Sequence, residues 1–233
     1  MRDRHSLPLY LQISEMLIRE INAGRLADGE RLPPERDYAA QLGTSVGTLR
    51  KSLADLTEKG LLERIQGSGN YIRARSDVQS VYTFFRVELL DGGGLPTADV
   101  LSVERVGKPA DLPQFGTNSE AYRIRRLRRL NGTPAVVEEI WLDADCAADV
   151  SEADLSESLY LYYREKLGLW ITSAEDRFSV SAVPDWAPSD FGQQSGEPAL
   201  LATRVSLTAD GNRVEVSRGW IDTNVATYVS RLR

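Results

Sequence analysis

The stretch RLPPERDYAAQLGTSVGTLRKSLADLTEK, residues 31–59, decides how the N-terminal part of this chain folds. Two helix-length segments flank a four-residue break at residues 43–46. The first segment opens at Pro34, whose missing N–H costs nothing at a helix start. The second segment carries a stripe of leucines at helical spacing, which would hold it on a core: Leu49, Leu53 and Leu56. The pattern predicts a helix-turn-helix.

The residues at the start of the second helix differ in chemical character from the leucines of its stripe. Its residues are small, hydroxylated or cationic and lie mostly off the stripe: Ser45, Gly47, Thr48, Arg50 and Lys51. A helix N-terminus of this kind can enter the major groove of DNA while the leucines anchor it. The second helix is therefore a candidate recognition helix.

The flanking sequence favours a winged helix. Upstream, residues 8–23 carry Ile13, Leu17 and Ile21 on one helical stripe. Downstream, residues 61–65 and 70–73 predict short strands around the tip Gln66-Gly67-Ser68-Gly69. A glycine-rich tip lets backbone N–H groups approach a phosphate or a minor groove closely. The alternative is a small helical domain with a solvated hairpin.

Residues 7–73 resemble the GntR family of bacterial transcription regulators almost without gaps. The resemblance lies in these blocks: Pro8-Leu9-Tyr10, Gln12-Ile13, Leu32-Pro33-Pro34-Glu35-Arg36, Leu42-Gly43, Thr48-Leu49-Arg50-Lys51-Ser52-Leu53, Gly60-Leu61-Leu62 and Gln66-Gly67-Ser68-Gly69. It implies a winged helix-turn-helix that binds double-stranded DNA.

The resemblance also implies which residues contact DNA. Several relatives have an arginine where this chain has Val46, and Gly47 adds no side chain. Base reading is therefore expected to depend on Arg50, the wing and a contact between the valine and a thymine methyl group. The predicted DNA-binding set is Arg36, Ser45, Val46, Gly47, Thr48, Arg50, Gln66 and Gly67.

Composition narrows the class of protein. The 233 residues suit two domains, and 42% hydrophobic with 27% charged residues is typical of a soluble globular protein. We expect no membrane span and no signal peptide. The single cysteine, Cys146, fits a reducing cytoplasm, and the single histidine, His5, leaves little for a metal site. We therefore expect a cytoplasmic protein with no metal, no cofactor and no catalytic residues.

Net charge is divided unevenly along the chain. Residues 1–75 hold 12 Lys+Arg and 10 Asp+Glu, whereas the remainder holds 16 and 24. A DNA-binding domain joined to an acidic domain would show this asymmetry. One domain with a net charge of +2 would bind DNA weakly, so we expect a homodimer on two half-sites of a palindromic operator.

The C-terminal part has the pattern of an antiparallel sheet. Hairpin signals stand at Asn131-Gly132 and Asp210-Gly211-Asn212. Helices are predicted at residues 159–167, before Gly168, and at residues 187–193. Strands are predicted at residues 81–90, 100–105, 122–130, 135–142, 171–183, 200–207 and 213–221. The chain is thus expected to be α+β, with a winged helix at 1–75, a linker at 76–81 and a sheet domain at 82–233.

Residues 82–233 resemble the UTRA effector-binding domain of the HutC-like branch of the GntR family, whose fold is similar to chorismate lyase. The resemblance lies in these blocks: residues 122–128, Asn131-Gly132-Thr133-Pro134, Glu138, Ser158-Leu159-Tyr160, Leu167-Gly168, residues 198–201 and Val214-Glu215-Val216-Ser217. It implies that a small metabolite binds here and changes the affinity for DNA. The predicted effector-binding set is Arg126, Arg128, Glu138, Ser158, Tyr160 and Glu215.

The residues themselves are compatible with an anionic ligand. Arg126 and Arg128 are two positions apart and share one face of a strand, where two guanidinium groups suit a carboxylate or phosphate. Ser158 opens a helix, where N–H groups favour anions, and Glu215 could receive hydroxyl or ammonium groups. The alternative is an ordinary cross-strand ladder of Arg126, Arg128 and Glu138, with Ser158 as a plain helix cap.

An enzyme is the competing function, because the UTRA fold resembles that of a lyase. The chain offers no suitable histidine, reactive cysteine or cofactor motif for catalysis, and a fused DNA-binding domain favours sensing. We therefore predict a transcription regulator, expected to be a repressor, that is controlled by a small anionic metabolite. A lyase-like enzyme tethered to DNA stays the alternative.

Overall fold

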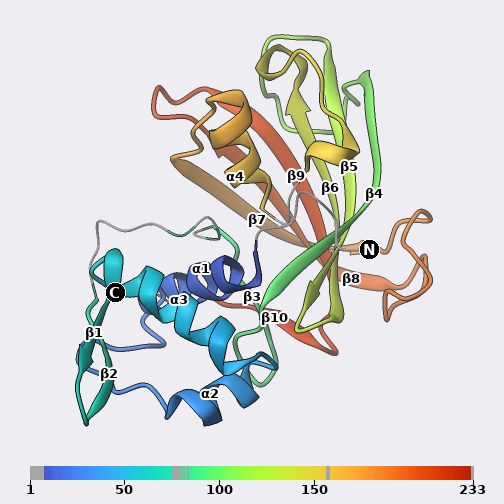
Figure 1. Cartoon of the computed structure of the whole chain (residues 1–233). Helices are drawn as coiled ribbons and strands as arrows, with labels where there is room; N and C mark the ends of the chain where they lie inside the picture. The colour runs from blue at the N-terminus through green and yellow to red at the C-terminus, as the bar shows by residue number, and fades with distance from the viewer. Residues whose placement is uncertain (1–7, 75–79, 81, 83, 156–157, 232–233) are drawn as a thin grey trace. The chain divides into compact units, whose positions relative to one another are not determined.

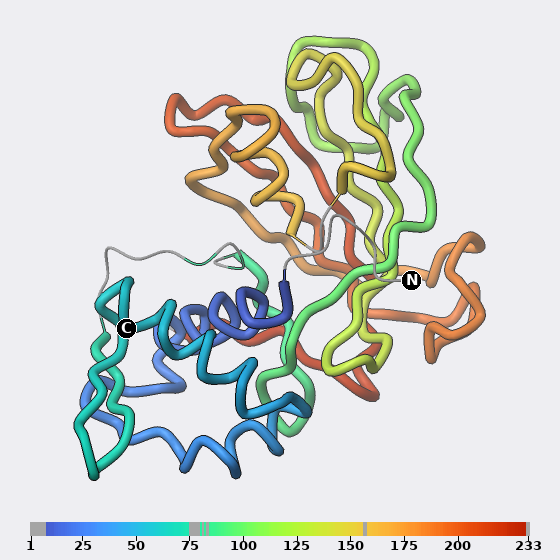
Figure 2. The backbone as a smooth tube through the Cα atoms, viewed as in Figure 1, coloured from blue at the N-terminus to red at the C-terminus, as the bar shows by residue number. Residues whose placement is uncertain are grey.

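The computed structural model describes residues 8–74, 80, 82, 84–155 and 158–231. They form two compact units, drawn in Figures 1 and 2. The first unit, called the head, runs to Arg86 and includes a short C-terminal segment from Val229. The second unit, called the body, runs from Val87 to Tyr228. Each unit has its own core and is described by itself.

The head is a winged helix-turn-helix, as predicted. A bridge between Arg31 and Tyr71 adds a third short strand segment to the wing hairpin. In the described part of the head the elements are α1 (Leu9–Asn22), α2 (Glu35–Gln41), α3 (Val46–Glu58), β1 (Leu62–Ile65) and β2 (Gly69–Ile72).

Helix α3 is fixed at its start by a cap and along its length by leucines. The Ser45 hydroxyl accepts a hydrogen bond from the Thr48 N–H at 3.1 Å, which satisfies one of the free donors at the helix start. The turn before the cap needs the left-handed conformation, which Gly43 adopts with a φ of +61°. The leucine stripe is buried, at no more than 2% exposure for any member: Leu49, Leu53 and Leu56. These contacts set the exposed start of α3 on a rigid base.

The head ends at Arg86 and the body begins at Val87, whereas the sequence predicted a linker at residues 76–81. Residues 76–79 and 81 of the predicted linker lie outside the described residues. The two units meet between Arg86 and Val87, five residues after the predicted start of the second domain. Ser80 belongs to the head, since its hydroxyl donates to the Glu15 carbonyl at 2.8 Å.

The strand predicted at residues 81–90 is wrong over most of its length. Among its described residues only β3 (Val87–Leu89) is a strand, and residues 82 and 84 lie in turns, while residues 81 and 83 lie outside the described residues. The Phe85 N–H donates to the Tyr82 carbonyl at 2.8 Å, and the Arg19 guanidinium lies 5.6 Å from the Phe85 ring centroid. Phe85, which lies within the predicted strand, therefore packs on the head.

The body is an antiparallel sheet, as predicted. In the described residues β3 pairs with β10 (Ala226–Tyr228), and the main sheet has the order β4-β5-β6-β9-β8-β7. Asn131 and Gly132 have φ angles of +50° and +80°, which confirms the predicted tight hairpin between β5 and β6. The six strands of this sheet are β4 (Pro96–Gly107), β5 (Glu120–Leu130), β6 (Thr133–Asp143), β7 (Ser173–Ala182), β8 (Pro198–Leu207) and β9 (Arg213–Ile221).

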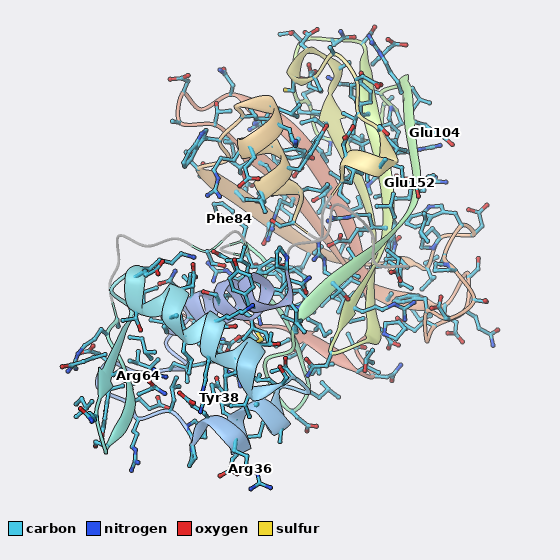
Figure 3. The ribbon with its side chains drawn as sticks, in the orientation of Figure 1. Arg36, Tyr38, Arg64, Phe84, Glu104 and Glu152 are labelled. Atoms are coloured by element: carbon cyan, nitrogen blue, oxygen red, sulfur yellow. The ribbon has the colours of Figure 1, made fainter. Side chains whose placement is uncertain are left out.

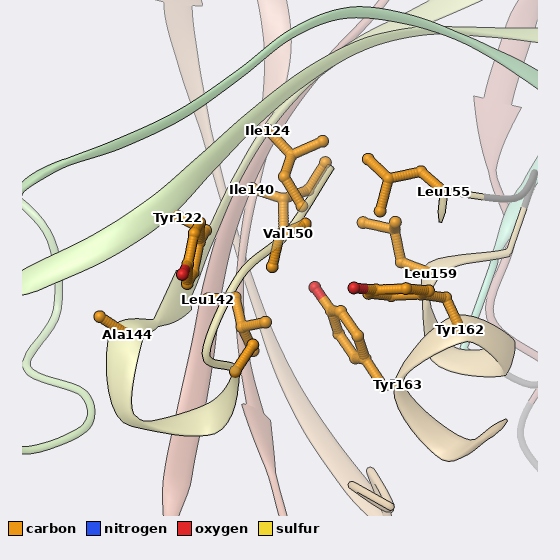
Figure 4. Close-up of a cluster of buried hydrophobic side chains, with 11 residues drawn as sticks. Tyr122, Ile124, Ile140, Leu142, Ala144, Val150, Leu155, Leu159, Tyr162 and Tyr163 are labelled. Carbon is orange, nitrogen blue, oxygen red and sulfur yellow. The ribbon is translucent and has the colours of Figure 1, made fainter. Parts of the chain in front are cut away.

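One face of the sheet packs against a short helical segment, seen in Figures 1 and 4. The segment is α4 (Leu159–Tyr162) followed by a π-helical turn (Tyr163–Leu167), and it ends at Gly168 with a φ of +63°. The predicted helix is therefore present, but only its first turn is α-helical. Its buried side chains contact residues of β5 and β6 in one cluster: Tyr122, Ile124, Ile140, Leu142, Leu159, Tyr162 and Tyr163.

The other face is covered by the loops at residues 108–119 and 184–197. Two clusters fill it: one includes Phe115 and Trp141, the other Phe191 and Trp220. The helix predicted at residues 187–193 is wrong, because this segment forms turns. Pro188 lacks an N–H and disfavours a helical residue before it, so the loop closes through the Phe191 N–H on the Pro188 carbonyl at 3.0 Å.

A search of the described residues for a helix long and apolar enough to cross a membrane finds none.

Candidate functional site

The predicted DNA-binding residues of the head gather at the start of α3, at the start of α2 and on the wing. Ser45 and Gly47 are exposed, and Val46 and Thr48 are partly exposed. The Ser45 hydroxyl is also 2.8 Å from the Thr48 hydroxyl, so capping and any contact with DNA involve the same side chains. Arg36 extends outward from α2 (Figure 3).

Glu35, which the sequence analysis did not single out, joins two of these regions. Its Oε2 accepts a hydrogen bond from Arg50 Nε of α3 at 2.6 Å, and its Oε1 accepts from Arg64 Nη2 of β1. The hydrogen bond with Arg50 is the largest cause that holds the pKa of Glu35 below its usual value; burial opposes it, and the charges of Arg50 and Arg64 assist it. The carboxylate therefore stays ionised at neutral pH.

The wing tip contains a glycine in the backbone conformation that favours glycine. Gly67 has a φ of +76°, and a Cβ placed there would have no atom of the protein within 4 Å. Gln66 beside it is exposed. Together with residues 31–35 and Arg64, the tip lines a groove on the head. The backbone of the tip is thus open to a large ligand.

In the body, register places the predicted effector-binding residues of the strands on one face of the sheet: Arg126, Arg128, Glu138 and Glu215. Arg126 is opposite Glu138, and Glu215 is opposite Leu142, four residues farther along β6 on the same face. This spacing corresponds to roughly 13 Å along the strand. The face therefore carries two hydrogen-bonded groups of side chains.

The first group is the arginine pair, Arg126 and Arg128, with Glu138 between them. Arg126 Nη2 donates to Glu138 Oε2 at 2.7 Å, and Arg128 Nε donates to Glu138 Oε1 at 3.0 Å. Burial alone would raise the pKa of Glu138, but the charges of Arg128 and Arg126 lower it to about 2. The predicted cross-strand ladder is present in these contacts.

The ladder does not pair all the hydrogen-bond donors of Arg126. The residue is 4% exposed, yet its Nε and Nη1 have no hydrogen-bond partner in the described part of the chain. Burial lowers the pKa of Arg126, since the charged form is the one that loses hydration. Buried donors without acceptors are costly, and an anionic group beside Arg126 would supply the missing acceptors.

The second group is the hydroxyl cage around Glu215, which is 2% exposed. Its Oε2 accepts from the Tyr163 hydroxyl at 2.7 Å, and its Oε1 accepts from Ser206 at 2.8 Å and from Tyr160 at 3.2 Å. Burial raises the pKa of Glu215 although these hydroxyls lower it. Both carboxyl oxygens of Glu215 therefore already accept hydrogen bonds from hydroxyl groups of the protein.

A partly buried ion pair extends the same face toward β7. Arg204 Nε and Nη2 donate to the two carboxylate oxygens of Asp176 at 2.6 and 2.7 Å. The Tyr228 hydroxyl of β10 also donates to Asp176. Arg204 is two positions from Ser206 on β8, so the alternation of polar residues along this strand was the signal that could have revealed it.

Ser158 has a structural contact of its own. Its hydroxyl accepts from the Leu161 N–H at 3.3 Å and caps α4. Because α4 is four residues long, it offers no extended helix N-terminus for an anion. Tyr163 is the residue that the sequence analysis missed here, and it lies between the two groups, since it bonds Glu215 and interacts electrostatically with Arg126.

Comparison with known families is decisive for the class of protein. Residues 9–72 match the model described as bacterial regulatory proteins, gntR family, and residues 91–226 match the UTRA domain. The chain belongs to the GntR family. The GntR family, the UTRA domain and the α+β fold class predicted from sequence are confirmed.

Individual relatives of this GntR-family protein are similar to it over almost the whole chain. The HTH-type transcriptional regulator SmoD of Agrobacterium fabrum is 62% identical over 228 residues, covering 98% of this chain and 97% of that protein. The HTH-type transcriptional repressor NagR of Bacillus subtilis is 28% identical, covering 90% and 88%. The crystal structure of the possible regulator YydK from Bacillus subtilis has the same fold, with a TM-score of 0.55 at 22% identity, covering 97% and 100%.

These findings settle the functional class. The protein is a DNA-binding transcription regulator whose GntR head is joined to an effector-binding UTRA domain. The named relatives are regulators rather than enzymes, so the preference for a sensor over a lyase is confirmed.

Proposed function

We propose that this GntR-family regulator is a cytoplasmic repressor of the HutC-like branch that binds a palindromic operator as a homodimer. Arg50 and the start of α3 would read bases in the major groove, while Arg36, Gln66 and Gly67 would contact the backbone or the minor groove. The repressor function is in keeping with the name of NagR, a transcriptional repressor. The low positive charge of the head, 12 cationic against 10 acidic residues in positions 1–75, favours two heads over one.

We further propose that the effector carries an anionic group held by the arginine pair. The observation that supports this proposal best is the buried Arg126 guanidinium, whose Nε and Nη1 have no acceptor among the described residues. Arginine binds carboxylates and phosphates through charge-assisted, often bidentate hydrogen bonds. Tyr160 and Tyr163 of the hydroxyl cage would contact the polar remainder of such a molecule.

The effector would act by binding one conformation of the dimer better than another. A ligand shifts such an equilibrium only by its differential affinity for the two states. The hydroxyl cage and the Arg204–Asp176–Tyr228 group share one face of the sheet, and Tyr228 belongs to the strand β10 that pairs with β3. Strand β3 directly follows Arg86, the last residue of the head. We therefore expect the β3–β10 pair to couple effector binding in the body to DNA binding by the head.

A thermal-shift screen of the full chain tests the effector site. The panel is inorganic phosphate, sulfate, sugar phosphates, sugar acids and neutral sugars. A ligand at 100 times its dissociation constant stabilises the folded state by about 2.7 kcal/mol and raises the melting temperature. We expect an anionic compound to do so for the wild type and to lose its effect on Arg126→Gln.

The control is Arg125→Gln, which changes the adjacent arginine on the opposite face, where it donates to Glu139 at 2.8 Å. This variant should keep the ligand-induced shift. An anionic compound that stabilises Arg126→Gln as much as the wild type would show that the effector binds elsewhere. Stabilisation by neutral sugars alone would contradict the proposed ligand class.

A further inference from the structure

Glu35 occupies a special position among the charged residues of the head. It is the first residue of α2, its side chain is 20% exposed, and its carboxylate contacts both the recognition helix and the wing. The two arginines that it binds are far more exposed, at 64% for Arg50 and 57% for Arg64. One carboxylate thus holds two solvent-facing cations from separate elements.

The two arginines are not held equally. Arg64 has a second partner, since its Nε donates at 3.3 Å to the side chain of the buried Asn70. Arg50 is bonded to Glu35 through Nε, and in the described residues no other side chain binds it. With Nε engaged, Nη1 and Nη2 remain available, and two adjacent guanidinium donors are what a bidentate contact with guanine O6 and N7 requires.

The carboxylate of Glu35 has a cost for DNA binding. It lies beside cations that would face phosphates, so it weakens the electrostatic attraction that drives non-specific binding to DNA. It also restricts a long side chain that would otherwise sample many rotamers. Both effects favour specificity: an arginine fixed in one orientation binds the matching base well and adapts poorly to others.

We propose that Glu35 is a positioning residue for operator recognition. Its carboxylate orients the Arg50 guanidinium toward a base and couples the recognition helix to the wing through Arg64. It raises the ratio of specific to non-specific affinity while lowering non-specific affinity itself. This inference rests on the proposed base reading by Arg50.

The test compares Glu35→Gln with the matched variant Asp37→Asn in the full-length protein. Asp37 is an exposed acidic residue in the same first turn of α2, and no ion pair involves it in the described part of the chain. Both variants remove one negative charge, and only one of them removes the contact with Arg50. Affinity is measured over a range of salt concentrations for a duplex selected by the wild type from a random library and for an unrelated duplex of equal length.

We expect Asp37→Asn to strengthen binding to both duplexes by the same factor. Glu35→Gln should strengthen binding to the unrelated duplex and weaken binding to the selected one, so that their ratio falls by at least about tenfold. In an Arg50→Ala background, Glu35→Gln should leave the ratio unchanged, because its effect acts through Arg50. A role limited to folding would not produce opposite changes on the two duplexes.

Two results would overturn the inference, and they differ in what else they affect. If Arg50→Ala lowers the ratio while Glu35→Gln behaves like Asp37→Asn, Glu35 has no positioning role and base reading by Arg50 stands. If Arg50→Ala leaves the ratio at the wild-type value, both the base-reading proposal and the role of Glu35 are wrong.

Discussion

A carboxylate bound by two arginines occurs in the head at Glu35 and in the body at Glu138, and these two groups differ in burial. In the head, Arg50 and Arg64 around Glu35 have side chains that are 64% and 57% exposed. In the body, Arg126 and Arg128 around Glu138 are 4% and 6% exposed. The same contact between a carboxylate and two arginines is therefore exposed to solvent at Glu35 and buried at Glu138.

The difference in burial suits the two groups to the different functions that we propose for them. An exposed arginine–carboxylate contact contributes little to stability, so it can exchange its partner for DNA at small cost. A buried group has lost its hydration and depends on complete pairing. The unpaired donors of Arg126 make the buried group a place where an anion of molecular size can be bound, whereas the exposed group suits an extended polyanion.

The largest effect should come from removing the carboxylate of the buried group. Glu138→Gln leaves Arg126 and Arg128 charged without their shared anion and should lower the free energy of unfolding of the body by roughly 3–5 kcal/mol. Glu35→Gln, the same change in the head, should alter stability by about 1 kcal/mol or less. All four tryptophans lie in residues 141–220, so their fluorescence during urea unfolding reports on the body, and helical circular dichroism reports on the head. Equal losses for the two variants would remove the distinction between the groups.

The two carboxyl groups of the body should give opposite dependences on pH. Glu138 has its pKa lowered from 4.5 to about 2, so its contribution of about 3 kcal/mol is present above pH 4.5 and is lost as the pH falls toward 2. Glu215 has its pKa raised by burial, so the folded state binds its proton more tightly than the unfolded state does. Stability of the body should therefore fall as the pH rises from 4.5 through that raised pKa.

Urea titrations of the tryptophan signal between pH 2 and pH 8 measure both slopes. Glu138→Gln should abolish the acid slope, and Glu215→Gln should abolish the slope above pH 4.5. A Glu215→Gln variant with an unchanged profile would mean that the hydroxyl cage holds an ionised carboxylate with an ordinary pKa.

A smaller effect, on binding rather than on stability, is expected in the head. Arg50→Ala should weaken binding to the selected operator by about 1–3 kcal/mol, the value of one good base contact. Fluorescence anisotropy of labelled operator measures the change. Lys51→Ala, which removes the neighbouring exposed cation, is the control and should weaken binding to all duplexes alike. Unchanged affinity for Arg50→Ala would exclude it as a base-reading residue.

The smallest predicted effect concerns Gly47. An added Cβ would have Ser45 Oγ as its nearest contact, at 3.8 Å, so Gly47→Ala fits the helix and should stabilise the head by about 0.5 kcal/mol. If the backbone at Gly47 approaches DNA closely, the same variant should bind operator more weakly. A stabilised head with unchanged operator affinity would place the contact elsewhere.

The elements that depend on local patterns could be predicted from the sequence. The leucine stripe fixed α3, and alternation along β5 placed Arg126 and Arg128 on the same face, where the register puts them. The hairpin at Asn131-Gly132 followed from the demand for two positive φ angles.

The contacts that depend on tertiary structure could not be predicted. The partners of Glu35 come from α3 and from the wing, 15 and 29 residues away, and no periodicity links them. Tyr163 contacts Glu215 across 52 residues because a π-helical turn directs it to the sheet. Phe85 lies in a segment predicted as a strand, but it packs against Arg19 of the head.

The most direct test of the whole account measures operator binding by full-length Arg126→Gln with and without the anionic compound that stabilises the wild type. The account predicts that this variant binds the selected operator with wild-type affinity and that the compound no longer changes that affinity, while Arg125→Gln responds as the wild type does. A wild-type response by Arg126→Gln would contradict control through the arginine pair.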